Sequence, residues 1–294
     1  MKIATYWHGG TRHVGRLSDD GGSVTPLNTG EQARESGALA LVEGMALGLP
    51  LPAEAGPPVP LAAVRLEAPL RPRRNIFCVG KNYHEHAREF AQSGFDSSTA
   101  APGDDIPSHP IIFSKVPDAV IGTGAAIRIP AGISEAIDYE AELAVVIGRG
   151  GRGIPAARAM EHVWGYTIIN DVTARDWQQR HKQWLLGKSF DTFCPMGPWL
   201  VTADELDGVN TRVRCWVNDE LRQDARTTDL IFPIPTLIET ISAGITLYPG
   251  DLISTGTPVG VGIGFTPPRY LQPGDRVRIE IGGIGILENP VERS

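Results

Sequence analysis

The stretch that decides the fold is DYEAELAVVIG, residues 138–148, in which three acidic residues stand at alternate positions. Successive side chains of a β-strand point to opposite faces, so Asp138, Glu140 and Glu142 are expected to share one face. The next two positions of that face are alanine and valine, which indicates that it is buried further along. Like charges on a buried face repel one another, and a bound cation is the simplest physical remedy.

A fourth carboxylate, Asp171, ends the β-branched segment WGYTIIND at residues 164–171. Glutamate and aspartate oxygens form a hard ligand set, which selects Mg²⁺, Mn²⁺ or Ca²⁺ over zinc or copper. Three protein oxygens would also leave positions open for water and for a chelating substrate. Taken alone, however, alternating glutamates on a strand are more often a solvent-facing acidic edge, so this segment by itself leaves both interpretations open.

The segment CVGKNYHEHAREF, residues 78–90, predicts a strand, a glycine turn and a short helix. On that helix His86 and Glu89 are three residues apart and therefore neighbours, whereas His84 and Arg88 occupy a different face. A carboxylate beside an imidazole fixes its tautomer and raises its basicity, as a general base requires. The alternative is an exposed polar helix whose histidine has no chemical role.

Two basic residues and one turn complete the chemically suggestive set. Lys188 lies in a largely apolar loop, where a partly desolvated ammonium can stabilise an enolate oxygen; a surface lysine is the alternative. Arg175 suits bidentate binding of a carboxylate, the alternative being an ion pair with Asp176 or another neighbour. The glycine-rich turn at residues 250–262 offers backbone N–H groups to an anion, but it matches neither a P-loop nor a dinucleotide-binding turn.

Composition indicates an ordinary soluble globular chain of 294 residues, with 41% hydrophobic residues, 21% charged residues and a net charge of −7. Because basic residues do not dominate, nucleic acid is excluded as a main partner. No apolar run reaches the roughly 18 residues of a membrane span, and the first residues lack a secretory pattern. Cys78, Cys194 and Cys215 are too scattered for a disulfide framework, so we expect buried thiols and a cytoplasmic protein.

The pattern of expected secondary structure changes near residue 70. Residues 1–70 predict a small α/β domain with three short strands, a helix over Thr29–Leu47 and a proline-rich linker at 49–64. Short β-branched segments separated by Gly/Pro turns follow, interrupted by helices expected at Ile154–His162 and Pro235–Ala243. We therefore expect an α+β, predominantly β fold, with a mixed sheet or sandwich in a second domain at residues 71–294.

Six segments occurring in one order resemble the fumarylacetoacetate hydrolase family: GKNYHEHARE, PIIFSK, DYEAELAVVIG, GYTIINDVTARDWQ, GKSFDTFCPMGP and GDLISTGTPVGVG. The resemblance covers residues 73–294, and residues 1–70 resemble the small N-terminal extension of bacterial members. It implies a mixed β-sandwich roll, a Mg²⁺ or Mn²⁺ cofactor and a homodimer. The implied site residues are the metal ligands Glu140, Glu142 and Asp171, the acid–base pair His86 and Glu89 on a lid helix, Lys188 at the reacting oxygen, Arg175 and Gln178 at the substrate carboxylate, and Thr257 in the pocket wall.

Two departures from the family pattern concern substrate choice. Val116-Pro117-Asp118 replaces the family's usual proline and small hydroxyl residue after PIIFSK, and this loop is expected to border the pocket. Residues Ser97–Asp105 form a long polar stretch in the lid region, which is expected to carry specificity.

The resemblance implies an enzyme acting on a small 2-keto or 2,4-diketo acid. As the main reaction we expect C–C bond hydrolysis of an acylpyruvate or fumarylpyruvate, as in aromatic catabolism: His86 activates water for attack at C4, and the enolate of pyruvate leaves, stabilised by the cation and Lys188. The same site permits decarboxylation of an oxaloacetate-like acid or keto–enol isomerisation of a hydroxymuconate-type diacid. A non-catalytic binding module is the remaining alternative.

Overall fold

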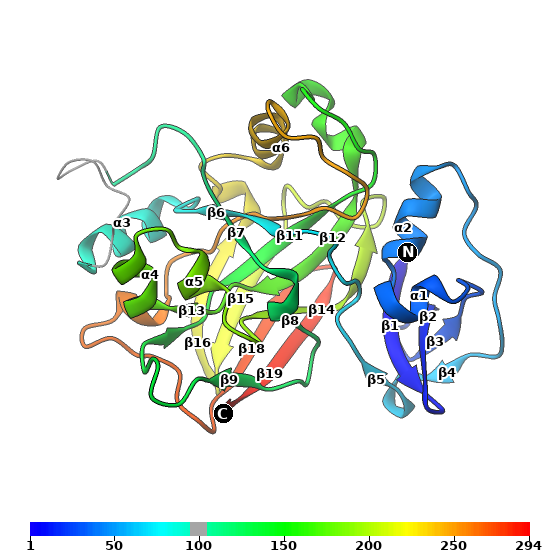
Figure 1. Ribbon diagram of the computed structural model, residues 1–294, viewed down its shortest axis with the longest axis horizontal. Coiled ribbons are helices and arrows are strands. Elements are labelled where there is room, and N and C mark those ends of the chain that lie inside the picture. Colours follow the sequence, from blue (N-terminus) through cyan, green and yellow to red (C-terminus); the bar gives the residue numbers. More distant parts are fainter. Residues whose placement is uncertain (95–104) are drawn as a thin grey trace.

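The computed structural model describes residues 1–94 and 105–294, so the expected specificity loop Ser97–Asp105 lies outside the described residues except for Asp105. Within the described part the fold is predominantly β with mixed sheets, as the sequence predicts (Figure 1). The strands of a large sheet have the order β4-β3-β2-β1-β14-β12-β11-β17-β6-β7. Two short strands join it outside this order, since β5 pairs with β1 and β8 pairs with β14. A five-stranded sheet has the order β16-β15-β18-β19-β9, and β10 pairs with β13.

The strands have the following bounds: β1 Lys2–His8, β2 Thr11–Leu17, β3 Ser23–Pro26, β4 Val59–Pro60, β5 Arg65–Leu66, β6 Ile76–Gly80, β7 Ile111–Lys115, β8 Val120–Ile121, β9 Ile127–Ile129, β10 Ile137–Asp138, β11 Ala141–Ile147, β12 Val163–Asn170, β13 Thr173–Ala174, β14 Cys194–Thr202, β15 Arg212–Val217, β16 Glu220–Arg226, β17 Leu252–Ser254, β18 Arg276–Ile281 and β19 Gly285–Arg293. The α-helices are α1 Gln32–Ser36, α2 Leu39–Ala46, α3 His84–Gln92, α4 Arg175–His181, α5 Leu185–Lys188 and α6 Ile234–Ser242. Short 3₁₀ helices cover Leu61–Ala63, Pro117–Ala119, Ala156–His162, Thr227–Asp229 and Gly262–Gly264.

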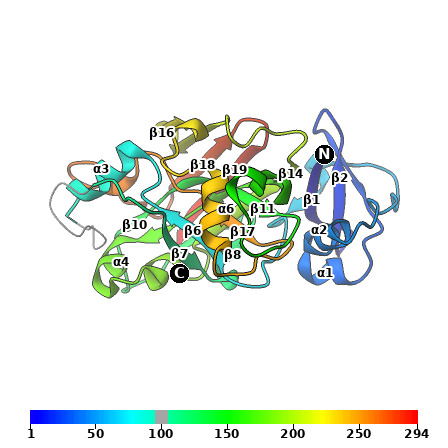
Figure 2. The ribbon, with the colours of Figure 1, turned by 90° about the horizontal axis from the view of Figure 1, so that it is seen from above.

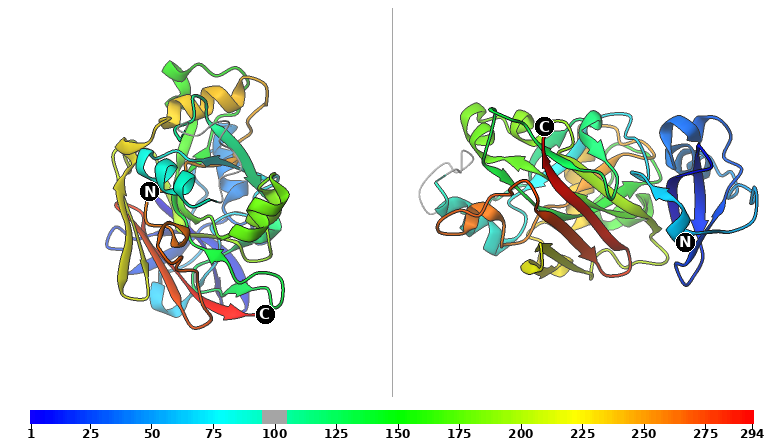
Figure 3. Two further views of the ribbon diagram at one scale, coloured as in Figure 1. Left: turned by 90° about the vertical axis from the view of Figure 1, so that its left-hand side faces the viewer. Right: turned by 90° about the horizontal axis from the view of Figure 1, so that it is seen from below.

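The two sheets pack face to face, with β14 against β19, β11 against β15 and β12 against β18 (Figure 3). Strand β11 lies between β12 and β17 in the large sheet, and all seven of its residues are buried. Leu143, Val145 and Ile147 belong to one core cluster, while Ala144 and Val146 belong to another on the opposite face. The expected burial of the acidic strand's face is therefore confirmed, and both of its faces are covered.

The expectation of one continuous strand over residues 138–148 is wrong. Asp138 ends β10, which pairs with β13, and β11 begins only at Ala141 and pairs with β12 and β17. The carboxylate of Asp138 accepts the backbone N–H groups of Gly262 (2.6 Å) and Ile263 (3.0 Å). These contacts hold Asp138 against the glycine-rich turn, which explains why the chain leaves the large sheet there.

The N-terminal strands lie at one end of the molecule (Figure 2) and extend the large sheet, because β1 pairs antiparallel with β14 through Lys2↔Val201 and Ile3↔Leu200. A domain boundary at residue 70 stays a prediction. The proline-rich segment is more than a linker, since its residues Val59–Pro60 form the short edge strand β4.

The expectation of a single helix over Thr29–Leu47 is wrong. Two helices, α1 and α2, lie there, and Gly37 lies between them. Gly37 has a φ of 62°, and a side chain there would lie 2.8 Å from both the Pro69 carbonyl oxygen and Thr5 Oγ1. A close approach between segments far apart in the sequence thus requires glycine and interrupts the helix.

Both helices expected in the second half of the chain are present, with ends that differ from the expected ones by at most two residues. The first is a 3₁₀ helix over Ala156–His162, and the second is α6. They pack together, and Ser242 Oγ accepts the Ile154 N–H at 2.9 Å.

All three cysteines are free and buried, as expected. None of the described helices has the length and apolarity that crossing a membrane requires.

We predict that Gly165→Ala strongly destabilises the fold. Gly165 in β12 pairs with Thr202 in β14, and a methyl group there would overlap the Val201 carbonyl oxygen. Because both neighbours are backbone in a central sheet, overpacking should lower the free energy of unfolding by about 2–3 kcal/mol in urea titrations. The control Gly244→Ala has no atom within 4 Å of the added methyl and should change stability by less than about 0.5 kcal/mol. Equal effects of the two changes would contradict this packing.

Candidate active site

Side chains from several elements converge on a small cavity of about 10 Å³ at the end of the large sheet, near α3 and α4 and away from the N-terminal strands (Figure 1). The residues that line it are Val79, Gly80, Lys81, His86, Phe90, Phe113, Glu140, Glu142, Arg175, Gln178, Trp184, Lys188 and Thr257. Seven of the nine residues that the resemblance implied are among them. The other two, Glu89 and Asp171, contact residues of this lining directly.

Three carboxylates gather at the centre of the site. Oxygen atoms of Glu140, Glu142 and Asp171 lie within 4.8 Å of one another, and all three residues are buried. The antiparallel pairing of β11 with β12 places Ala141 opposite Asn170, and the Asp171 N–H donates to the Glu140 carbonyl at 2.8 Å. Acidic residues some 30 positions apart in the sequence therefore meet because they flank one strand pair.

Two lysines neutralise part of this cluster. Lys188 Nζ bridges Glu140 Oε2 at 2.8 Å and Asp171 Oδ2 at 2.7 Å. Lys115, at the end of β7, donates to Asp171 Oδ1 at 2.7 Å and to the Val172 carbonyl at 3.0 Å, and it also contacts the Lys188 carbonyl. Lys115 was not predicted as a site residue; its one sequence signal is a lysine at the end of an apolar strand, inside the PIIFSK motif.

Arg175 forms buried ion pairs, but not with Asp176. Its Nε donates to Asp138 Oδ2 at 2.9 Å, and its Nη2 lies 2.7 Å from Glu140 Oε1. Nη1 donates to Gln178 Oε1 at 3.1 Å, while Asp176 instead accepts a hydrogen bond from a neighbouring serine. The guanidinium thus lines the cavity with its orientation fixed by two carboxylates, and substrate binding by Arg175 and Gln178 stays a prediction.

The two glutamates of the cluster have opposite electrostatic surroundings. Burial alone would raise the pKa of Glu140, but Lys188 and Arg175 outweigh it and lower that pKa to about 2. Burial, together with the negative charges of Asp171 and Glu140, raises the pKa of Glu142 to about 8. Glu142 accepts hydrogen bonds from Ser254 Oγ at 2.6 Å and from the Gly256 N–H at 2.9 Å. Glu142 is therefore the carboxylate whose ionisation calls for a further positive charge.

The predicted imidazole–carboxylate pair is present on α3. His86 Nδ1 lies 3.0 Å from Glu89 Oε2, and both side chains are largely buried. Glu89 is held in turn by the Gly260 N–H, which donates to its Oε1 at 3.0 Å. The expected division of helix faces is confirmed, since His84 and Arg88 are exposed. With Nδ1 engaged by Glu89, the second ring nitrogen of His86 is the one left for proton transfer in the cavity.

The glycine-rich turn binds anions, as its sequence indicates, but the anions are the protein's own carboxylates. Gly256 donates its N–H to Glu142, Gly260 donates to Glu89, and Gly262 donates to Asp138. Gly256 and Gly260 both have a φ of 103°, a backbone conformation that side chains disfavour. One turn therefore positions the carboxylate cluster and the histidine pair together.

Further residues support the lining. The Thr257 hydroxyl accepts a hydrogen bond from buried Gln223 at 2.8 Å. Lys81 is buried in the cavity wall with a φ of 55°, which marks a strained non-glycine position of the kind found at functional sites. Asn82 donates to the Thr255 carbonyl at 2.8 Å and so ties the start of α3 to the glycine-rich turn. Sequence reasoning missed Gln223 and Asn82, because their partners are distant in the chain, and it missed Lys81, because no sequence pattern predicted its positive φ.

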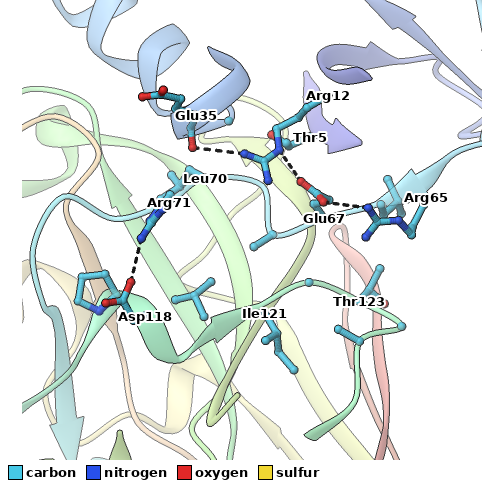
Figure 4. A pocket seen from close by; sticks show the side chains of 18 residues that line it. Thr5, Arg12, Glu35, Arg65, Glu67, Leu70, Arg71, Asp118, Ile121 and Thr123 are labelled. Carbon is cyan, nitrogen blue, oxygen red and sulfur yellow. Dashed lines mark hydrogen bonds and ion pairs between the residues drawn. The ribbon is translucent and has the colours of Figure 1, made fainter. Parts of the chain in front are cut away.

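The loop Val116–Asp118 does not border this site, contrary to expectation. Pro117 and Asp118 line a different cavity of about 590 Å³ between the N-terminal strands and β8, where Asp118 pairs with Arg71 at 2.9 Å (Figure 4). The physical reason is that Lys115 is anchored on Asp171, while the next residues form a 3₁₀ helix and then β8, which pairs with β14. Departures from the family pattern in this loop therefore carry no information about the shape of the active site.

The residues present suit a divalent cation. The donor set is three buried carboxylates, which are hard ligands preferred by Mg²⁺, Mn²⁺ and Ca²⁺. Burial, together with the charges of Asp171 and Glu140, raises the pKa of Glu142, so a further positive charge would stabilise its ionised form. The identity of the metal stays a prediction.

Comparisons with known proteins agree with this picture. The family model described as fumarylacetoacetate hydrolase, C-terminal, matches residues 75–292. "Oxaloacetate tautomerase YisK" of Bacillus subtilis is 48% identical over 79% of this chain and 74% of its own length, and the bovine mitochondrial "Oxaloacetate tautomerase FAHD2B" is 42% identical over 95% of this chain and 87% of its own. Two solved structures match over the full length of both chains. The fumarylacetoacetate hydrolase of Exiguobacterium antarcticum has a TM-score of 0.85 at 38% identity, and the 5-carboxymethyl-2-hydroxymuconate delta-isomerase of Mycobacterium smegmatis has 0.78 at 37%.

We predict that Mg²⁺ or Mn²⁺ stabilises the protein and that Glu142→Gln removes about half of this effect or more. At an ion concentration of 100 times Kd, wild-type unfolding should cost about 2.7 kcal/mol more than without the ion. Loss of one carboxylate ligand should weaken binding by at least about tenfold, the smallest effect expected from altering a metal site. Calorimetric titration and thermal melts with and without the ion measure both quantities.

The matched control for this experiment is Asp118→Asn, which makes the same carboxylate-to-amide change in the other cavity. It should leave ion affinity unchanged. Equal affinity of wild-type protein and Glu142→Gln, or equal losses in both variants, would refute the metal site.

Proposed function

The chain belongs to the fumarylacetoacetate hydrolase family, and from this premise we propose that it catalyses keto–enol tautomerisation of a small 2-oxo dicarboxylic acid, with oxaloacetate as the first substrate to test. The observation that carries the proposal is the His86–Glu89 pair facing the same cavity as a cluster of carboxylates and buried cations. The relatives named as oxaloacetate tautomerases support this reaction over the C–C hydrolysis that the sequence favoured.

The proposed reaction moves one proton and breaks no carbon–carbon bond. In the direction from enol to keto form, the enol hydroxyl loses its proton and C3 gains one. His86 suits this transfer, because Glu89 engages Nδ1 and stabilises the imidazolium, while the other ring nitrogen exchanges protons with the substrate. Glu89 keeps its own orientation through the Gly260 N–H, so the pair is preorganised.

Negative charge that develops on the substrate oxygen meets positive groups. An ammonium has three N–H donors, and Lys188 uses two of them on Glu140 and Asp171, which leaves the third for an enolate oxygen. A divalent cation held by Glu140, Glu142 and Asp171 would add Lewis-acid stabilisation of that oxygen. Such preorganised charges act where charge develops, which is the usual source of enzymatic rate enhancement.

The charge balance suits an anionic substrate. When ionised, the buried carboxylates outnumber the buried cations that contact them by one; the two groups are Asp138, Glu140, Glu142 and Asp171, and Lys115, Arg175 and Lys188. A bound divalent cation would change this balance to one net positive charge, which an anionic substrate offsets. Opposite charges brought together in a buried site also attract strongly.

C–C hydrolysis is the second candidate, supported by the name of the Exiguobacterium neighbour. Hydrolysis needs a water molecule beside the substrate, whereas tautomerisation does not. The expected homodimer, cytoplasmic location and role in aromatic catabolism stay predictions.

We predict that His86→Gln lowers the rate of oxaloacetate tautomerisation by about 100-fold or more, the typical loss when a general acid–base is removed. The decay of enol absorbance in the ultraviolet, with Mg²⁺ or Mn²⁺ present, follows the reaction. The control His84→Gln alters an exposed histidine on the same helix and should retain wild-type turnover.

Product analysis separates the proposal from its alternatives. Conversion of enol to keto oxaloacetate with unchanged mass supports tautomerisation. Catalysed release of carbon dioxide from oxaloacetate, at the same rate as the enol disappears, would show that the reaction is decarboxylation and not tautomerisation. Formation of pyruvate and a carboxylic acid from acylpyruvates, with no acceleration of the enol–keto exchange, would replace it by hydrolysis.

A further inference from the structure

The apolar side of the active-site cavity is an aromatic wall formed by Phe90, Phe113 and Trp184. Phe113 packs against the Lys188 ammonium, 4.9 Å from Nζ to the ring centre, and Phe90 lies 5.6 Å from the Arg175 guanidinium. These two rings therefore contact the cations of the charged side directly. Their removal would disturb the charged groups as well as the shape of the cavity.

Trp184 differs from the two phenylalanines in what it touches. Its ring meets Phe113 edge-on at 5.1 Å between centres and Phe90 at 6.2 Å, and its exposed fraction is 7%. A methyl group at Gly80 would overlap the Trp184 ring, so a glycine in the opposite wall leaves the space that the indole fills. The tryptophan is thus wedged between β6 and the two phenylalanine rings, in contact with the cavity.

Cavity shape then limits the length of the substrate. The carboxylate–carbonyl head of a 2-oxo acid belongs on the charged side, with the cations Lys188 and Arg175. Any additional methylene groups then lie against the apolar lining formed by Phe90, Phe113 and Trp184. Trp184 is the largest side chain of that lining.

We propose that Trp184 sets the upper chain length of the 2-oxo acid that the site accepts, and so acts as a specificity-determining residue. The proposal rests on the proposed function for the class of substrate, although not for the reaction. One methylene that a pocket cannot accommodate typically changes discrimination by 10- to 200-fold, and a smaller side chain at this position should remove that discrimination.

The test compares two 2-oxo acids that share the same head, pyruvate and 2-oxoadipate. The second is longer and also carries a terminal carboxylate, which is the same for every variant compared. Binding to wild-type protein, Trp184→Leu and Trp184→Ala is measured by isothermal titration calorimetry in excess Mg²⁺. Relative to pyruvate, the affinity for 2-oxoadipate should rise by at least about tenfold in Trp184→Ala and by a smaller factor in Trp184→Leu. Leu186→Ala changes an exposed leucine of the same short helix and should leave the ratio at its wild-type value.

Two results would overturn the proposal. One is an unchanged affinity ratio in folded variants, with folding checked by circular dichroism. The other is a parallel loss of both ligands, which would mean that Trp184 only holds helix α5 and Lys188, since the Lys188 N–H donates to the Trp184 carbonyl at 3.1 Å. The graded Leu variant keeps the test available if the alanine variant does not fold. A shifted ratio in a protein without tautomerase activity would refute the proposed function and leave this inference standing.

Discussion

Burial of several carboxylates in one place is the constraint on which the rest of this structure depends. A buried carboxylate without compensation is unstable by several kcal/mol, so each of these groups requires partners. Lys115 and Lys188 share Asp171, and Lys188 and Arg175 share Glu140. Glu142 has the weakest compensation, as its raised pKa shows. The elements that supply these partners are held in place by the charges that they neutralise.

The glycine-rich turn after β17 connects this cluster to the acid–base pair. Its backbone N–H groups bind Glu142, Glu89 and Asp138 within a few residues of chain. Rigid backbone donors cost little conformational entropy to order, and they fix the direction of each carboxylate. The relative placement of His86 and the carboxylates therefore depends on one loop.

The sequence predicted those parts of the site whose residues lie close together in the chain. The alternation around Glu140 and Glu142, the spacing of His86 and Glu89, and the motif context led to the residues that the structure brings together. Long-range pairings escaped prediction: Lys115 is tied to Asp171 across 56 residues of chain, and no periodicity signals it. The break before Ala141 and the turn at Gly37 likewise follow from contacts with distant backbone. The reaction was harder to predict than the residues, because hydrolysis, decarboxylation and tautomerisation of oxo acids all use one stabilised enolate.

The central claim is that Glu140, Glu142 and Asp171 together hold a divalent cation beside His86. Diffraction from crystals soaked in Mn²⁺, recorded at a wavelength where manganese scatters anomalously, tests it most directly. We expect a single strong anomalous peak bounded by the three carboxylates. A peak at another place, or an empty cluster at saturating Mn²⁺, would contradict it.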